Sequence, residues 1–131
     1  MALLDGKVLS GAGFSNESKL VRVMYDFSKD GGGIGTYEAM EVDSDSLVTF
    51  KCAYVHTGCA SGGSMTMRLG RGVAGTEFLS AKAVADMGLG KGFSGLGGAV
   101  KLLAGEKIEM GISTAALTAG KIELFFEIMS I

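Results

Sequence analysis

The chain of 131 residues contains no proline, no tryptophan, only one histidine and only two cysteines, Cys52 and Cys59. Two cysteines are too few for the disulfide framework of a small secreted domain. Charge is also scarce: 12 basic and 14 acidic side chains make up 20% of the chain, and no basic run occurs. Nucleic acid is therefore not an expected partner.

Long apolar runs are missing as well. No stretch approaches the about 18 apolar residues that a membrane helix needs, so no membrane partner is expected. The first residues, Met-Ala-Leu-Leu-Asp-Gly-Lys, are too few and too polar for a secretory signal peptide. Synthesis in a cytoplasm is the resulting expectation.

Glycine, in contrast, is abundant, with 22 residues. Without proline, this indicates many tight turns and closely packed backbones rather than an extended linker. With 47% apolar residues, the chain is predicted to form one domain over residues 1–131 that buries about two thirds of its unfolded surface. Because so little charge is left for the surface, part of it is expected to be covered by another subunit.

The clearest structural signal lies in residues 121–131. Apolar side chains occupy every second position, at Ile122, Leu124, Phe126 and Ile128. Glu123 and Glu127 lie between them and face the other way, which is the period of a β-strand. Phe125 and Met129 make this second face partly apolar. The pattern predicts a central strand, or one whose outer face is covered by a partner.

Shorter alternating segments precede this strand. They cover residues 19–27, 36–42, 47–56, 64–69 and 74–80, and residues 1–8 could form a first short strand. Residues 104–110 and 119–124 share a phrase, a small-residue turn followed by Lys-Ile-Glu, which predicts two closing strands of one sheet. About eight short strands with glycine-rich turns predict an all-β fold, an antiparallel, jelly-roll-like β-sandwich, with residues 1–13 as an N-terminal arm or edge strand.

Residues 90–95 match the dinucleotide-binding pattern G-x-G-x-x-G. In such a site the glycine loop leaves a strand and opens a helix, whose N-terminus meets the phosphate. Here the next residues are Leu-Gly-Gly, which start a helix poorly. The segment is therefore predicted to be a loop that binds no cofactor.

Cys52, His56 and Cys59 have the side chains of metal ligands at short spacing. A structural zinc site needs four ligands, and the chain has no further cysteine or histidine. Cys52 is expected on the inward face of its strand with Phe50 and Tyr54, as a buried thiol. His56 is expected to meet solvent at the strand end, and no G-x-S-x-G nucleophile motif accompanies it. Neither a metal site nor an enzyme is predicted.

Four carboxylates, Glu38, Glu41, Asp43 and Asp45, lie close together in the sequence. Paired carboxylates serve glycoside hydrolysis or calcium binding. The two aspartates alternate with serines, which is ordinary turn composition, and there is no tryptophan to stack on a sugar. A solvated turn is the prediction.

Residues 103–110 and 119–127, Leu-Ala-Gly-Glu-Lys-Ile-Glu-Met and Ala-Gly-Lys-Ile-Glu-Leu-Phe-Phe-Glu, resemble the closing strands of small jelly-roll proteins. This style is similar to the cement or decoration proteins of tailed-bacteriophage capsids, over about the last third of the chain. Such proteins oligomerise and bridge major capsid protein subunits on the outer surface of the head. The resemblance implies a non-enzymatic virion protein, with the major capsid protein and further copies of itself, as a dimer or trimer, for partners.

Contacts with the capsid or with other subunits are expected at the N-terminal arm and at the C-terminal end. The candidate residues are Met1, Ala2, Leu3, Leu4, Phe14, Met129 and Ile131. Two alternatives stay open. One is another virion component, such as a tail, neck or head-fibre subunit, and the other is a carbohydrate-binding jelly roll in which Tyr25, Tyr37 and Tyr54 stack on sugar rings.

Overall fold

The computed structural model describes residues 2–8, 18–72 and 75–131, and these residues form almost exclusively β-structure. The strands are β1 (Ala2–Leu3), β2 (Asp5–Val8), β3 (Lys19–Asp26), β4 (Gly35–Glu41), β5 (Ser46–Ser61), β6 (Thr66–Arg71), β7 (Leu79–Ala83), β8 (Gly92–Phe93), β9 (Val100–Leu102), β10 (Lys107–Ser113) and β11 (Leu117–Ser130). A short helix α1 (Phe27–Asp30) follows β3, and a 3-10 turn η1 (Val84–Asp86) follows β7. The predicted all-β fold is confirmed.

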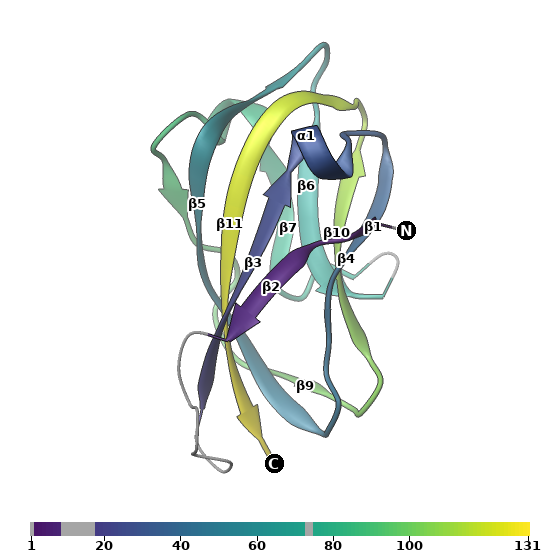
Figure 1. The fold of residues 1–131 in the computed structure, drawn as a ribbon, viewed down its shortest axis with the longest axis vertical. Helices are drawn as coiled ribbons and strands as arrows, with labels where there is room; N and C mark the ends of the chain where they lie inside the picture. Colours follow the sequence, from purple (N-terminus) through teal and green to yellow (C-terminus); the bar gives the residue numbers. More distant parts are fainter. Residues whose placement is uncertain (1, 9–17, 73–74) are drawn as a thin grey trace.

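The strands form two sheets that pack face to face (Figure 1). The five-stranded sheet has the order β1-β4-β10-β6-β7, and the six-stranded sheet has the order β2-β3-β11-β5-β8, with β9 also paired to β5. All pairs are antiparallel except β1 with β4. Between β3 and β6 the chain changes sheet at every strand, and it does so again between β10 and β11. This interleaving is the arrangement of a jelly roll.

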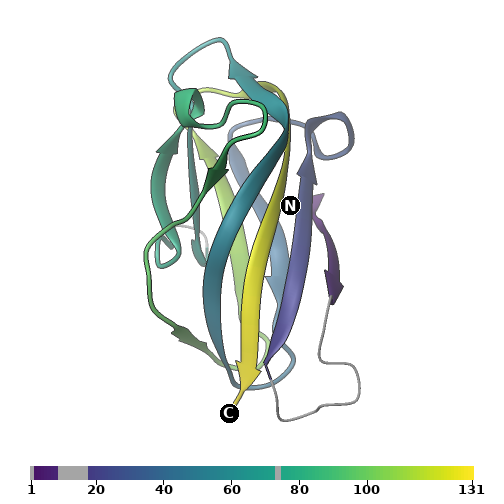
Figure 2. The same ribbon diagram turned by 90° about the vertical axis from the view of Figure 1, so that its left-hand side faces the viewer.

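The long strand β11 lies in the middle of the six-stranded sheet, between β3 and β5 (Figure 2). Ile122, Leu124 and Phe126 are fully buried, as their alternation predicts. The Phe126 ring lies 5.3 Å from the ring of Phe50 and 5.8 Å from that of Phe78. These rings occupy the core between the sheets, which explains why β11 requires an unbroken apolar face.

The two strands with the repeated phrase lie in different sheets, β10 in the five-stranded one and β11 in the six-stranded one. The prediction that they close the same sheet was therefore wrong. An alternating pattern specifies which side of a strand meets the core, but both sheets of a sandwich offer a core-facing side. The turn between the strands contains Thr114, whose φ of 75° makes it the one non-glycine residue with positive φ among the described residues.

Residues 2–8 join both sheets at one side of the sandwich. Ala2 and Leu3 pair with Tyr37 and Glu38 of β4, whereas β2 pairs with β3. The chain changes sheet at Leu4, whose side chain is 4% exposed and belongs to the core. The rest of the expected arm, residue 1 and residues 9–13, lies outside the described residues. Among those described, no helix is long and apolar enough to cross a membrane.

Candidate interaction surface

The outer faces of the two sheets differ in chemistry. On the five-stranded sheet, Lys107 Nζ lies 3.0 Å from Glu38 Oε1, and Arg68 Nη1 donates to the Gly75 carbonyl at 3.0 Å. In contrast, the exposed large hydrophobic side chains that belong to strands, Tyr54 and Met129, are both in the six-stranded sheet. The apolar surface within strands is therefore concentrated on one side of the sandwich.

That side is the outer surface of β3, β11 and β5, here named the β3–β11–β5 face. The register places its side chains in rows across the three strands, Met24–Glu123–Tyr54, Arg22–Phe125–Cys52 and Leu20–Glu127–Thr49, with Met129 beside Leu47 at the lower end. These residues alternate on β11 with the buried ones, so they point away from the core. Helix α1 and the loop around η1 flank the upper end of the face (Figure 2).

A β-bulge in β5 decides which residues of that strand reach this face. Phe126 pairs with Phe50 and Phe125 pairs with Cys52, so Lys51 is an extra residue. One extra residue exchanges the two faces of the strand beyond it. Cys52 is accordingly exposed, and Tyr54 is 43% exposed. The prediction that Cys52 and Tyr54 point inward with Phe50 was wrong, because the alternation does not continue through the bulge.

The upper half of the face contains a buried carboxylate. Glu123 Oε1 lies 2.8 Å from His56 Nε2, and Glu123 Oε2 lies 2.6 Å from Arg22 Nε. The Glu123 side chain is only 7% exposed, whereas those of Arg22 and His56 are 37% and 39% exposed. The Tyr54 ring meets the His56 ring edge to face at 4.9 Å. The cluster joins all three strands and anchors a charge that would be costly to bury alone.

His56 was expected at a strand end, but β5 continues to Ser61, and the histidine lies within the strand. Its hydrogen bond to Glu123 crosses 67 positions of sequence. Sequence reasoning missed this cluster, because nothing in the local pattern pairs the three residues. The one available signal was an acidic residue between two core positions of a central strand.

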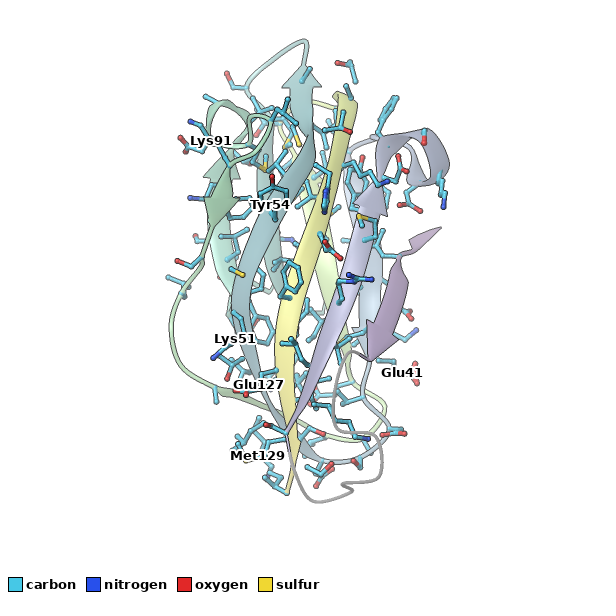
Figure 3. The ribbon with its side chains drawn as sticks, turned by 60° about the vertical axis from the view of Figure 1, so that its left-hand side comes forward. Glu41, Lys51, Tyr54, Lys91, Glu127 and Met129 are labelled. Atoms are coloured by element: carbon cyan, nitrogen blue, oxygen red, sulfur yellow. The ribbon has the colours of Figure 1, made fainter. Side chains whose placement is uncertain are left out.

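The lower half of the face combines a second ion pair with apolar side chains. Lys51 Nζ and Glu127 Oε1 are 3.8 Å apart, and both side chains are well exposed. Figure 3 shows Tyr54, Lys51, Glu127 and Met129 spread along the length of the face. Met129 is 42% exposed, and beyond it Ile131 is 61% exposed, with its backbone N–H bonded to the Asp45 carbonyl at 3.1 Å.

The residues expected to contact a capsid are thus placed differently from one another. Met129 and Ile131 are exposed at one end of the molecule. Ala2 and Leu3 form the edge strand β1, while the Leu4 side chain is buried. Met1 and Phe14 lie outside the described residues.

The glycine motif at residues 90–95 contains the two-residue strand β8, and no helix follows it in the described chain. Cys59 is half-buried against Gly120, and burial raises the pKa of its thiol to about 11. Among the described residues, no three His, Cys, Asp or Glu side chains gather to hold a metal ion. The candidate motifs are thus not brought together into one site.

A pocket of about 340 Å³ opens between β3, β4 and β11 at the lower end of the sandwich. Two of the four neighbouring carboxylates, Glu41 and Asp43, line it, but no histidine or cysteine does. Glu38 is instead paired with Lys107, and Asp45 Oδ1 accepts a hydrogen bond from the Ala104 N–H at 3.0 Å. The volume is at the low end for small-molecule sites.

Tyrosine stacking on a sugar is restricted by burial. Tyr25 and Tyr37 are 0% and 7% exposed, and their hydroxyls donate to the carbonyls of Gly31 and Gly33. Burial raises the pKa of both hydroxyls. Tyr54 is the one tyrosine whose ring is available on the surface.

Comparison with known proteins gives one kind of match. No protein-family model matches the chain, and no curated protein matches its sequence. Among solved structures, the chain is similar to one in the cyanophage Pam1 capsid asymmetric unit, with a TM-score of 0.62 and 14% sequence identity. The similarity covers 93% of this chain and 91% of that chain. At this identity the match demonstrates a shared fold over nearly the full length of both chains.

Proposed function

We propose that the protein is a non-enzymatic structural component of a phage virion, which binds the outside of the capsid as an oligomer and bridges major capsid protein subunits. The observation that carries this proposal is the fold shared with a chain of a cyanophage capsid over more than nine tenths of both chains. A match of that extent concerns the whole domain and not a common hairpin.

The surface chemistry supports the proposal. Bridging requires exposed surfaces for several partners at once, because several weak contacts together give strong attachment. The molecule offers the β3–β11–β5 face and, at its lower end, the exposed side chains of Met129, Ile131 and Leu103. Ala2 and Leu3 add an edge strand on the other side of the sandwich.

The charge of the chain supports a position on the outer rather than the inner surface of the capsid. Its net charge is -2 and its isoelectric point is about 5.3. A protein on the inner surface faces the phosphates of packaged DNA, which favour many basic side chains. A cement role also implies synthesis in the host cytoplasm, where heads are assembled.

Within this proposal, Ala2, Leu3, Met129 and Ile131 contact the capsid or a neighbouring subunit, and Met1 and Phe14 are proposed to do the same. Leu4 holds the arm in place, since its side chain is inserted into the core. These contacts lie on at least two sides of the molecule, as a bridge between neighbouring capsid subunits requires.

The test is co-sedimentation of the purified protein with expanded phage heads that lack it. We expect saturable binding at hundreds of copies per head, and weaker binding of the double variant Met129→Glu, Ile131→Glu. Ser80→Arg, on the exposed edge strand β7, is the matched control and should bind normally.

Two outcomes would contradict the proposal. Binding of a few copies at one vertex would indicate a tail, neck or head-fibre subunit. No binding to heads, together with binding to a glycan array that is lost in Tyr54→Ala, would indicate a carbohydrate-binding module.

A further inference from the structure

The size of the β3–β11–β5 face limits how strong a contact it can make. Neighbouring strands are about 4.8 Å apart, and each residue adds about 3.3 Å of length. Three strands of about eight to ten residues therefore present roughly 400–500 Å². Standard specific interfaces bury roughly 600–1,000 Å² on each partner, and smaller ones belong to weaker, reversible contacts. The face thus has the size of a weak, concentration-dependent contact.

The charges of this face cancel. Arg22 and Lys51 provide two positive charges, and Glu123 and Glu127 provide two negative ones. A surface built for a strongly charged partner would have an excess of one sign. A surface that contains both signs in equal number can instead be complementary to a rotated copy of itself.

The middle of the face combines apolar side chains with one arginine. Phe125 lies at the centre of the central strand, between Arg22 on β3 and Cys52 on β5, and Leu20 and Met24 lie in the adjacent rows. Glu123 and Glu127 lie above and below Phe125 on the same strand. Aromatic residues, methionine and arginine are the side chains that protein interfaces use more often than the rest of the surface.

The buried carboxylate of Glu123 is also compatible with a protein interface on this face. Covering a charged group normally costs its hydration. Glu123 has already lost almost all contact with water, since its side chain is 7% exposed and both oxygens lie against Arg22 or His56. A second molecule can therefore cover Glu123 at little additional desolvation cost, and the remaining cost falls on the partly exposed Arg22 and His56.

We propose that the β3–β11–β5 face is a two-fold self-association surface, on which a second copy of this chain packs sheet against sheet with Phe125 near the axis. This deepens the proposed function and rests on it for the role of the dimer, whereas the contact itself is testable without any capsid. The dimer would present two capsid-binding ends, each with its own Met129 and Ile131, and so bridge neighbouring subunits.

The first test measures the mass of the full-length protein by light scattering over a range of concentrations. We expect a dimer, and a dissociation constant at least about thirty-fold weaker for Phe125→Arg, the size of effect seen at central interface residues. Leu20→Lys, one row away, should also weaken the dimer. Ser80→Arg, on the other sheet, should leave it unchanged. Circular dichroism and thermal melting must show that each variant is folded.

Cys52 provides a second test that leaves the face unaltered. In a Cys59→Ser background it is the one remaining thiol, and it is exposed on the face beside Phe125. In a two-fold contact the Cys52 residues of the two copies approach the axis together. A short bis-maleimide should then link the copies into covalent dimers, and Phe125→Arg should suppress the link.

A wild-type monomer, a stable trimer, or a dimer that resists Phe125→Arg and gives no Cys52 link would each overturn the self-association surface. Head binding distinguishes this failure from failure of the proposed function. If those solution tests fail while wild-type protein and Phe125→Arg occupy heads equally well, the capsid role stands and the surface is refuted. If the face instead binds the capsid protein, Phe125→Arg loses head binding while the mass in solution is unaffected.

Discussion

Two neighbouring glycines give a sharp test of the packing at the upper end of the β3–β11–β5 face. Gly32, just after α1, is buried, and its carbonyl accepts a hydrogen bond from the Leu117 N–H at 2.8 Å. A Cβ added at Gly32 would meet the Leu117 carbonyl oxygen and would lie 2.9 Å from the Leu117 Cβ. Gly33 is exposed, and a Cβ there would meet nothing within 4 Å.

We therefore expect opposite effects of the same substitution. Gly32→Ala must move the start of β11, which costs about 1–3 kcal/mol for overpacking and about 0.5–1.5 kcal/mol for the weakened hydrogen bond. Gly33→Ala should stabilise the protein by about 0.4–1 kcal/mol, because alanine restricts only the unfolded chain there. The combined difference is roughly 2–5.5 kcal/mol, or about 6–25 °C in melting temperature.

Urea unfolding followed by circular dichroism measures the free energy of unfolding of each variant. The slope of this free energy against urea concentration should be the same in both variants. Equal stability of the two variants would refute the close contact between Gly32 and Leu117. This includes equal destabilisation of both variants, which would mean that the whole turn, and not one contact, is sensitive.

Three further predictions concern the core, the backbone and the acid limit of stability. Phe126→Ala should lower the free energy of unfolding by about 3–5 kcal/mol in urea titrations, since its buried ring contacts Phe50 and Phe78; a loss below about 1.5 kcal/mol would contradict that packing. Thr114→Gly should raise the melting temperature by a few degrees, corresponding to about 1 kcal/mol, because the exposed threonine has a φ of 75°; a lower value would show that no strain is present. Hydrogen bonding to Ser28 lowers the pKa of Asp26 below its ordinary value, so this carboxylate stabilises the fold above that value and the stabilisation is lost as the pH falls through the lowered one. Melting temperatures between about pH 5 and pH 2 should therefore fall less for Asp26→Asn than for the wild type, and an equal fall would exclude this contribution.

Much of the fold could be predicted from the alternation of apolar residues. The pattern identified β11, and also β3, where Val21, Val23 and Tyr25 are buried as expected. It succeeded because each of these segments has one face in the core for most of its length, so burial determines the sequence directly. The prediction of a jelly-roll-like sandwich followed from the number and spacing of such segments.

Features that depend on pairing between distant segments were not predictable in this way. The bulge at Lys51 has no glycine or other local mark, yet it turns Cys52 outward. The contact of Glu123 with Arg22 and His56 depends on the register of three strands. A single sequence specifies each strand's buried side, but the register emerges only when the strands assemble.

The proposed capsid role is tested most directly by cryo-electron microscopy of expanded heads with and without added protein. The expected result is additional density on the outer surface, repeated at equivalent positions over the whole shell, into which the sandwich fits and which contacts more than one major capsid protein subunit. A shell without added density, or density restricted to one vertex or to the inner surface, would contradict the proposal.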